Sequence, residues 1–161
     1  MNRARPRLNS KEAKTVTMKL KLDIQDMTNE FFEDSRLLGI VNPIKDYQFC
    51  RQLNKQLRFD FRINNQIEIQ LKKKQRKYFF SVYEFSELHC SLNHYLYNNQ
   101  FDGEYLLPEF RHLDFLWLLK GDAVDEAFLS DLMHAIKSIT GVQLVMELAH
   151  EKIKHKAHLI F

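Results

Sequence analysis

The sequence of 161 residues contains little glycine, proline or cysteine, and it has no long apolar run. Its four glycines are too few and too scattered to build the glycine-rich phosphate-binding loops of nucleotide enzymes. Cys50 and Cys90, the two cysteines, stand outside any Cys-x-x-Cys pair, which argues against zinc fingers and dithiol redox chemistry. The best-marked nucleotide, zinc and redox sites therefore have no support.

Segments that direct a chain to a membrane or out of the cell are also missing. The longest purely apolar run is Phe115 to Leu119, whereas a membrane-spanning helix needs about 20 such residues. A secretory signal needs an apolar stretch of about 7 to 15 residues near the N-terminus, and the first 24 residues contain none. We therefore expect a cytoplasmic protein without membrane insertion, whose cysteines stay thiols and form no disulfide.

What is present is typical of a globular domain, with 45% hydrophobic and 28% charged residues. The net charge of +3 is unevenly distributed: residues 1–17 carry +4, which leaves −1 for residues 18–161. A folded face that binds phosphate needs clustered lysine and arginine, and here much of the excess lies in a segment with little to bury. The sequence predicts a flexible basic N-terminal extension over residues 1–17 and a single α+β domain over residues 18–161.

The first half of this domain alternates between strand and helix periods. Residues 18–24 alternate apolar and polar side chains, which predicts a half-buried strand. A second apolar run, Leu37 to Val41, leads into Asn42 and Pro43, a pair suited to cap and open a helix. That helix would carry its apolar residues at helical spacing, namely Tyr47, Cys50, Leu53 and Leu57.

Several short strands are predicted to follow as an antiparallel meander over residues 59–97. Adjacent asparagines tolerate positive φ, so Asn64 and Asn65 predict a tight hairpin between strands near residues 59–63 and 67–71. Further strands are predicted over residues 78–85 and 88–97, the latter with Cys90 inside it. Asp102-Gly103 then marks a turn.

The last third predicts a strand, a capped helix and a strand. The apolar run from Phe115 to Leu119 indicates a buried strand, and Asp122 is placed to cap a helix that Gly141 ends. The helix has an apolar stripe of Val124, Phe128, Leu132, Ala135 and Ile139. A strand over residues 142–148 completes a βαβ unit, and residues 150–161 suggest a short terminal helix. The predicted fold class is α+β, with a mixed, mainly antiparallel sheet and two or three helices covering one face.

The segment Leu107-Pro108-Glu109-Phe110-Arg111-His112-Leu113-Asp114-Phe115 resembles the motif that names the IPExxxVDY family of uncharacterised bacterial proteins. Pro108, Glu109 and Asp114 match the motif in type and spacing, while Phe115 stands where the family has tyrosine. The resemblance covers residues 18–161 and implies no established activity. Since Phe115 has no hydroxyl group, the packing of its ring is what this position can supply.

This motif segment contains the most compact set of candidate site residues: Pro108, Glu109, His112, Asp114 and Phe115. Glu109, His112 and Asp114 could perform acid-base chemistry if their side chains gathered in a cleft. In the structural interpretation, which we favour, Pro108 fixes the backbone, Glu109 caps exposed N–H groups and Asp114 lies on a strand beside Leu113 and Phe115.

A second candidate site is the basic cluster Lys72, Lys73, Lys74, Arg76 and Lys77. Its position between two strands predicts a solvated hairpin loop, and phosphate contacts are the alternative. Five aromatic residues of the meander would allow RNA to stack if the outward ones formed an open patch beside this loop, namely Tyr78, Phe80, Tyr83, Tyr95 and Tyr97.

Metal and cofactor binding have little support in the sequence. His94 and Cys90 would share a strand face, but four residues of strand span about 13 Å, which is too far for one ion to bridge. His89 adds nothing to that pair. On the terminal segment, His150, His155 and His158 have no acidic or thiolate partner nearby in sequence, so we predict that they are exposed. We expect no metal and no cofactor.

These observations leave three hypotheses on function. The first is a non-enzymatic protein that binds another macromolecule, either a partner protein or a second copy of itself through its aromatic sheet face. The alternative is an accessory RNA-binding protein that uses residues 72–77 with the N-terminal tail. The second alternative is an acid-base enzyme at Glu109, His112 and Asp114.

Overall fold

The computed structural model describes residues 23–122 and 124–161. The chain divides into two compact units, Met1–Glu33 and Asp34–Phe161. The predicted basic extension over residues 1–17 lies outside the described residues. The division follows Glu33, whereas the sequence placed the start of the domain at residue 18.

The described part of the first unit contains a helix over residues 23–32. Ile24, Thr28 and Phe32 recur at helical spacing, and the Thr28 hydroxyl donates to the carbonyl of Ile24 at 2.7 Å. The strand predicted over residues 18–24 is therefore wrong at Asp23 and Ile24, and the rest of it lies outside the described residues. A short alternating run did not outweigh the longer helical period that follows it.

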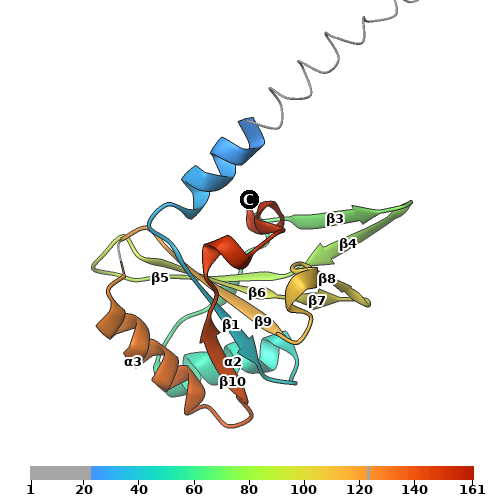
Figure 1. The fold of residues 1–161 in the computed structure, drawn as a ribbon. Coiled ribbons are helices and arrows are strands. Elements are labelled where there is room, and N and C mark those ends of the chain that lie inside the picture. The colour runs from blue at the N-terminus through green and yellow to red at the C-terminus, as the bar shows by residue number, and fades with distance from the viewer. Residues whose placement is uncertain (1–22, 123) are drawn as a thin grey trace, which may run out of the picture. The chain divides into compact units, whose positions relative to one another are not determined.

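The second unit is built on a six-stranded sheet with the strand order β10-β1-β9-β6-β5-β2 (Figure 1). Its strands are β1 (Arg36–Val41), β2 (Arg62–Ile63), β5 (Val82–Ser86), β6 (Asn93–Asn98), β9 (Phe115–Lys120) and β10 (Leu144–Glu147). All five pairings within it are antiparallel, so the expected α+β class with a mainly antiparallel sheet is confirmed.

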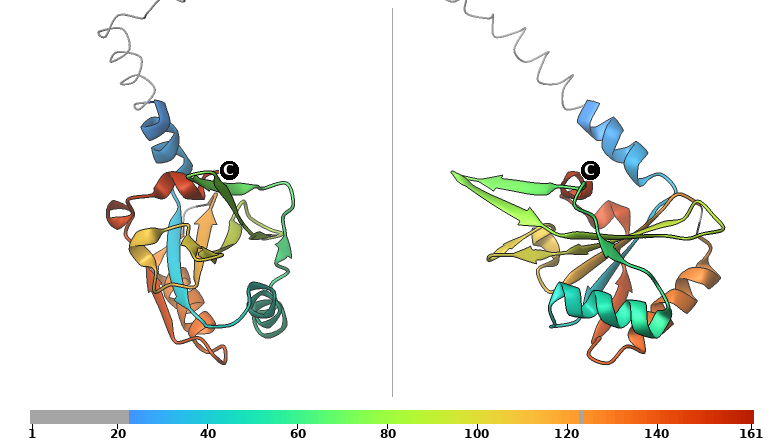
Figure 2. Two further views of the ribbon diagram at one scale, coloured as in Figure 1. Left: turned by 90° about the vertical axis from the view of Figure 1, so that its right-hand side faces the viewer. Right: turned by 180° about the vertical axis from the view of Figure 1, so that it is seen from behind.

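Two separate hairpins extend this architecture. One consists of β3 (Ile69–Lys73) and β4 (Arg76–Phe80), and the other of β7 (Gln100–Phe101) and β8 (Glu104–Tyr105). Figures 1 and 2 show the β3–β4 hairpin projecting beyond the end of the sheet, with β7 and β8 beside its β4 strand. The turn predicted at Asp102-Gly103 joins β7 to β8, and both of its residues have positive φ.

The two helices of this unit, α2 (Asp46–Leu57) and α3 (Glu126–Lys137), cover one face of the sheet (Figure 2), as predicted. Phe49 and Leu53 of α2 and Leu132 of α3 pack into one core cluster with sheet residues such as Leu38 and Trp117. Covering this face removes large apolar side chains from water, which is the main stabilising contribution to such a fold.

The opposite face of the sheet is covered by irregular segments and 3-10 turns. These turns are η1 (Pro108–Phe110), η2 (His150–Lys152) and η3 (Lys156–Leu159). The Tyr97 hydroxyl of β6 donates to the carbonyl of Leu159 at 3.0 Å, and Leu113 packs where a Cβ on Gly39 would lie. Because both faces are covered, β9 is buried along almost its whole length, which explains its unbroken apolar sequence.

The predicted βαβ unit is present, with β1 lying between its two strands. Both β9 and β10 pair antiparallel with β1, so they run parallel to each other on either side of it, and α3 connects them. The helix is capped by Asp125, whose Oδ1 accepts from the N–H of Phe128 at 2.7 Å. The prediction of Asp122 as the cap is wrong, because the Asp122 carboxylate accepts from the N–H of Ser91 instead.

The cap predicted for the first helix of this unit is also wrong. Asn42 is fully buried, and its N–H donates to Asp114 Oδ2 at 2.8 Å, which ties it to the sheet. The helix begins after Lys45, whose N–H donates to the side chain of Gln48 at 3.2 Å. Tyr47, predicted to lie on the apolar stripe, is exposed.

The hairpin predicted at Asn64-Asn65 does not form. Instead, β2 pairs with β5, and β3 pairs with β4 in the separate hairpin, so residues 59–97 are not a simple meander. The Asn64 side chain accepts from the N–H groups of Gln66 and Ile67, which turns the chain out of the sheet. The two adjacent asparagines correctly predicted that the chain turns here. They did not determine which strand the following segment pairs with.

The strand predicted over residues 88–97 begins only at Asn93. Leu88 and Cys90 lie exposed in the preceding turn, so the prediction of Cys90 inside a strand is wrong. Both cysteines are free thiols, as expected, with Cys50 buried in α2. The predicted terminal helix is replaced by the two 3-10 turns η2 and η3. Among the described helices, none has the length and hydropathy required to cross a membrane.

Candidate functional site

The motif glutamate binds the C-terminal segment. Glu109 lies in η1 and its Oε1 accepts from the N–H groups of Lys154 and His155 at 2.7 and 3.0 Å, while Oε2 lies 2.7 Å from His155 Nδ1. Partial burial acts to raise the pKa of Glu109, but its hydrogen bonds with backbone N–H groups and the His155 ring outweigh burial and lower that pKa. Glu109 thus stabilises the backbone of a segment that is distant in the sequence.

The motif aspartate acts on a different segment. Asp114 immediately precedes β9, and its carboxylate accepts from the N–H of Asn42 at the end of β1. Its own N–H donates to the carbonyl of Ile40 at 2.9 Å. Asp114 therefore joins the end of β1 to the beginning of its neighbour β9.

Asn99, which the sequence analysis did not single out, organises the whole motif segment. It is fully buried, and its Nδ2 donates to the carbonyls of Phe110 and Leu113 while its Oδ1 accepts from the N–H of Leu107. A buried amide with all these bonds made holds an irregular segment in one conformation. One asparagine among neighbouring Asn98 and Gln100 carries no sequence signal of such a role.

The acid-base constellation of Glu109, His112 and Asp114 is not gathered around a common cleft. Glu109 contacts the C-terminal segment, Asp114 contacts Asn42, and His112 is exposed beside the ring of Phe110 at 6.3 Å. Pro108 is the first residue of η1. Phe115 packs its ring against Phe49 of α2 at 4.7 Å, so this position contributes packing to the core.

The residues considered for metal binding near the start of β6 form a hydrogen-bonded chain. The Trp117 indole donates to His94 Nδ1 at 3.1 Å, which leaves the other ring nitrogen of His94 to donate to Glu87 at 2.9 Å. Glu87 also accepts from the exposed Cys90 thiol at 3.2 Å. His89 takes no part in this chain.

His94 is neutral in this arrangement. Burial lowers its pKa, and the opposing effect of Glu87 does not offset this, while a protonated ring could not accept from Trp117. The rings of Phe59, Phe61 and Phe85 surround it. The chain therefore has its hydrogen bonds satisfied, and His94 is its buried titratable group.

The three histidines of the terminal segment have partners elsewhere in the fold. His155 faces Glu109, an acidic partner 46 residues away, and His158 lies 2.7 Å from the carbonyl of Leu106. His150 lies 2.9 Å from the carbonyl of Ser35. The prediction that they are simply exposed is wrong for His150 and His158, which are half-buried. Within residues 23–122 and 124–161, no group of three potential ligands could hold a metal ion.

The basic cluster forms the free end of the β3–β4 hairpin. The prediction of a hairpin loop holds only for Lys74, which lies in the turn at positive φ, because the other four residues belong to the strands themselves. The two faces of the hairpin differ. On the inner face, Lys73 pairs with Glu104 and Arg76 pairs with Asp102, both on the neighbouring β7–β8 hairpin. These two charges are therefore compensated.

The outer face of the hairpin carries the remaining charge together with an exposed ring. The register places Lys72 opposite Lys77 and Gln70 opposite Phe79. Strand alternation puts these four side chains on one face, since Tyr78 and Phe80 are buried on the other. Phe79 is 46% exposed, and Lys72, Lys74 and Lys77 have no acidic partner in the described part of the chain. Glu68, beside Gln70, marks the base of this positive face.

The aromatic residues of the main sheet do not form an open patch. Tyr83, Tyr95 and Tyr97 are buried within the unit, so the sheet face that was predicted to mediate a homodimer is not available. Of the aromatics expected beside the basic loop, Tyr78 and Phe80 are buried as well, and Phe80 packs against Phe101 of β7 with ring centroids 6.1 Å apart. The exposed rings in this region are Phe79 and Phe101, which the sequence analysis did not single out.

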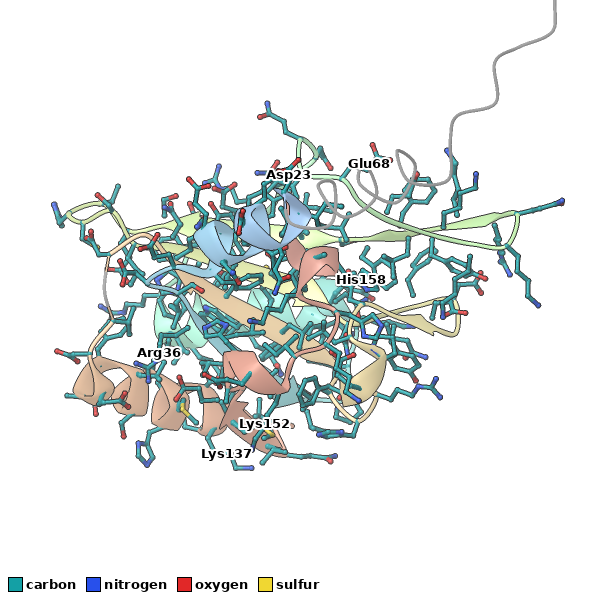
Figure 3. All side chains as sticks on the ribbon, turned by 45° about the horizontal axis from the view of Figure 1, so that its top comes forward. Asp23, Arg36, Glu68, Lys137, Lys152 and His158 are labelled. Carbon is teal, nitrogen blue, oxygen red and sulfur yellow. The ribbon has the colours of Figure 1, made fainter. Side chains whose placement is uncertain are left out.

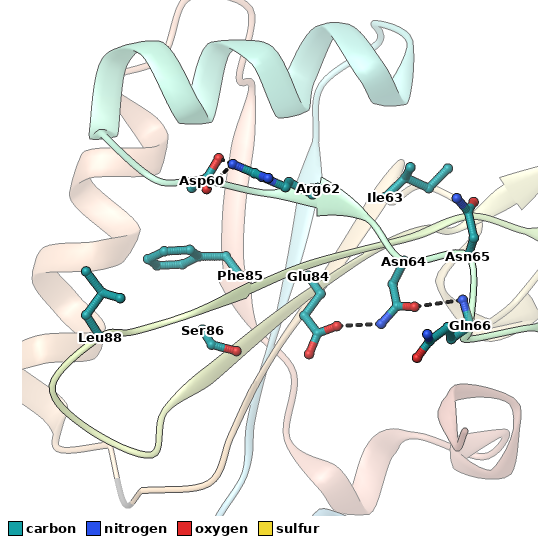
Figure 4. Close-up of a pocket in the computed structure, with 10 residues that line it drawn as sticks. All are labelled: Asp60, Arg62, Ile63, Asn64, Asn65, Gln66, Glu84, Phe85, Ser86 and Leu88. Atoms are coloured by element: carbon teal, nitrogen blue, oxygen red, sulfur yellow. Dashed lines mark hydrogen bonds and ion pairs between the residues drawn. The ribbon is translucent and has the colours of Figure 1, made fainter.

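The surface also contains shallow hollows. One, of about 720 Å³, runs along the β2 edge of the sheet and is drawn in Figure 4. Most of its lining residues are polar, and they include an Asp60–Arg62 ion pair and a hydrogen bond from Asn64 to Glu84. Because these charged side chains already have partners in the lining, the hollow does not point to a ligand.

Comparisons with known proteins add no assignment. No protein-family model matches the sequence, and a search of curated proteins gives no significant match. The resemblance to the IPExxxVDY family stays a prediction that rests on the segment from Leu107 to Phe115. Function is therefore argued from the geometry, in which the outer face of the β3–β4 hairpin is the best candidate site.

Proposed function

We propose that the protein is a non-enzymatic binding protein whose partner is single-stranded RNA, held on the outer face of the β3–β4 hairpin. The observation that carries the proposal is the combination on this face of uncompensated lysines, Lys72, Lys74 and Lys77, with the exposed ring of Phe79. Lysines attract the phosphate backbone, and an aromatic ring offers a surface on which a base stacks.

The arrangement of the lysines does not stabilise the fold. Their presence is therefore better explained by binding than by stability. Lys72 and Lys77 lie directly opposite each other on adjacent strands, and like charges in this position destabilise a sheet. On the inner face of the same hairpin, the basic residues are paired with acids. A polyanion would relieve the repulsion on the outer face.

The shape of the hairpin also suits a flexible single strand. It projects from the sheet (Figure 1), so its outer face is open to a ligand that follows the ribbon. Its base is fixed, since Ile69, Tyr78 and Phe80 are buried on the inner face. An ordered platform of this kind loses little conformational entropy when a ligand binds.

The test measures binding of a fluorescein-labelled oligouridine to the full chain by fluorescence anisotropy across a salt series. We expect affinity to fall as salt rises. The triple variant Lys72→Gln/Lys74→Gln/Lys77→Gln should lower the slope of log K against log salt by about 2, since each phosphate contact on a single strand contributes about 0.7. Phe79→Leu should weaken binding by about fivefold or more through loss of stacking.

A matched control removes the same charge from another surface. Lys55→Gln/Lys152→Gln/Lys154→Gln changes three exposed lysines outside the hairpin and should leave the affinity within about twofold, because bulk charge contributes less than contact. Equal losses in the two triple variants would overturn the proposal. So would an affinity for oligouridine that does not depend on salt, and a DNA oligomer of matched length tests the preference for RNA.

A further inference from the structure

We infer that the chain forms a homodimer by pairing β10 of one copy with β10 of another, which extends the sheet across a two-fold axis. The starting point is that β10 is an edge strand. It is last in the strand order and pairs only with β1. Its four residues, Leu144 to Glu147, contain no proline or lysine of the kind that blocks an edge against further pairing, and its one charged side chain, Glu147, is paired with Arg36.

The backbone pattern shows which groups of β10 are free to pair. The N–H of Leu148 donates to the carbonyl of Leu37, so the alternation of an antiparallel ladder directs Leu144 and Met146 toward β1 as well. The N–H and C=O groups of Val145 and Glu147 therefore point away from the sheet. In a two-fold pairing centred on Met146, Val145 of each copy lies opposite Glu147 of the other, which makes four new backbone hydrogen bonds.

The charges beside this edge are self-complementary. Arg36 bonds both Glu126 at the start of α3 and Glu147 at the end of β10, which fixes the acidic end of the helix beside that end of the strand. Lys137, at the other end of α3, bonds the carbonyl of Gln143 just before β10. Figure 3 labels Arg36 and Lys137 at separate positions along α3. A two-fold axis through Met146 therefore turns the acidic end of one copy toward the basic end of the other.

An apolar hollow lies at the same edge, and a second copy would bury its surface. A groove of about 340 Å³ lies between α3 and β10, lined by Leu129, Met133, Leu144 and Val145 among others. Leu144 is 39% exposed. The opposite edge of the sheet offers no equivalent, because β2 has only two residues and the hollow beside it contains the Asp60–Arg62 ion pair.

The experiment measures the molar mass of the full chain by light scattering after size exclusion, at concentrations up to about 100 μM, where a dimer with a micromolar Kd is almost complete. We expect twice the mass of the chain. Val145→Pro should give a monomer, because it removes an outward N–H and proline is tolerated on an edge strand. It should lower the melting temperature only modestly, since the Val145 side chain is only partly buried against the core.

A charge exchange tests the geometry of the interface. Glu126→Lys and Lys137→Glu should each weaken self-association, since like charges then meet across the axis. An equimolar mixture of the two variants should dimerise again, because every such contact then joins opposite charges. A wild-type chain that stays monomeric, leaving this edge to a strand of another protein, overturns the inference, as does a mixture that fails to associate.

Discussion

The central sheet and the β3–β4 hairpin use charged and aromatic residues in opposite ways. In the sheet, each polar group of the chain from Trp117 through His94 to Glu87 has a partner, and the rings around it are packed. On the outer face of the hairpin, Lys72, Lys77 and Phe79 face solvent without compensation. The difference teaches that the core residues are explained by stability, whereas the hairpin residues need another explanation.

The sharpest test of this contrast is Trp117→Ala in the sheet. Trp117 is fully buried, so its truncation leaves a large cavity and removes the donor to His94. We expect a loss of about 3–5 kcal/mol in the free energy of unfolding, measured by urea denaturation. A loss no larger than that of a surface substitution would break the comparison.

A smaller effect in the sheet is expected from pH. The pKa of His94 lies below its ordinary value of 6.5 in the fold, so the unfolded chain takes up a proton at a higher pH than the folded chain does. The contribution of His94 to stability is therefore constant above about pH 7 and falls as pH decreases through 6.5 toward the folded pKa. Urea midpoints measured across this range should show the decline.

The variant His94→Gln isolates this contribution, because its amide can still accept from Trp117 and donate to Glu87 but does not titrate. Between about pH 7 and 5.5 its stability should fall less than that of the wild type, since the histidine no longer contributes there. The lowered pKa values of Glu87 and Glu109 act at lower pH, because stability from a depressed carboxyl pKa is lost only below its ordinary value. Parallel curves for the two proteins would refute the assignment to His94.

The smallest effect on stability is expected from the hairpin. Lys72→Gln/Lys77→Gln removes a repulsive cross-strand pair from an exposed surface. The free energy of unfolding should stay within about 0.5 kcal/mol of the wild type, or rise slightly, while oligouridine binding falls. A clear loss of stability by urea denaturation would show that these lysines support the fold and would weaken the argument for a binding site.

Particular elements show how far local patterns lead. The strand at Phe115 to Leu119 and the helix before Gly141 were predictable, because a buried strand gives a continuous apolar run and an amphipathic helix gives a periodic apolar pattern within a short stretch of sequence. The partners of β2 and β3 were not, since Asn64 and Asn65 indicate a turn but not which strand pairs next. The N-cap of α3 was predicted three residues too early. Asp122 and Asp125 are both suitable capping residues, and only the tertiary contact of Asp122 with Ser91 distinguishes them.

The candidate site shows the same limit. The sequence indicated the basic cluster, but only the hairpin register separates Lys72 and Lys77 from the compensated Lys73 and Arg76. In the motif, the type and spacing of Glu109 and Asp114 gave no sign that each bonds a different distant segment.

The sequence by itself determined the α+β class, the buried central strands and the location of the charge, because these follow from local periodicity and composition. The tertiary structure alone decided which strand is an edge, which lysines keep a free charge and which polar residues meet. These properties depend on contacts between residues far apart in the chain, such as His155 with Glu109 and Asn42 with Asp114, and no local pattern encodes them.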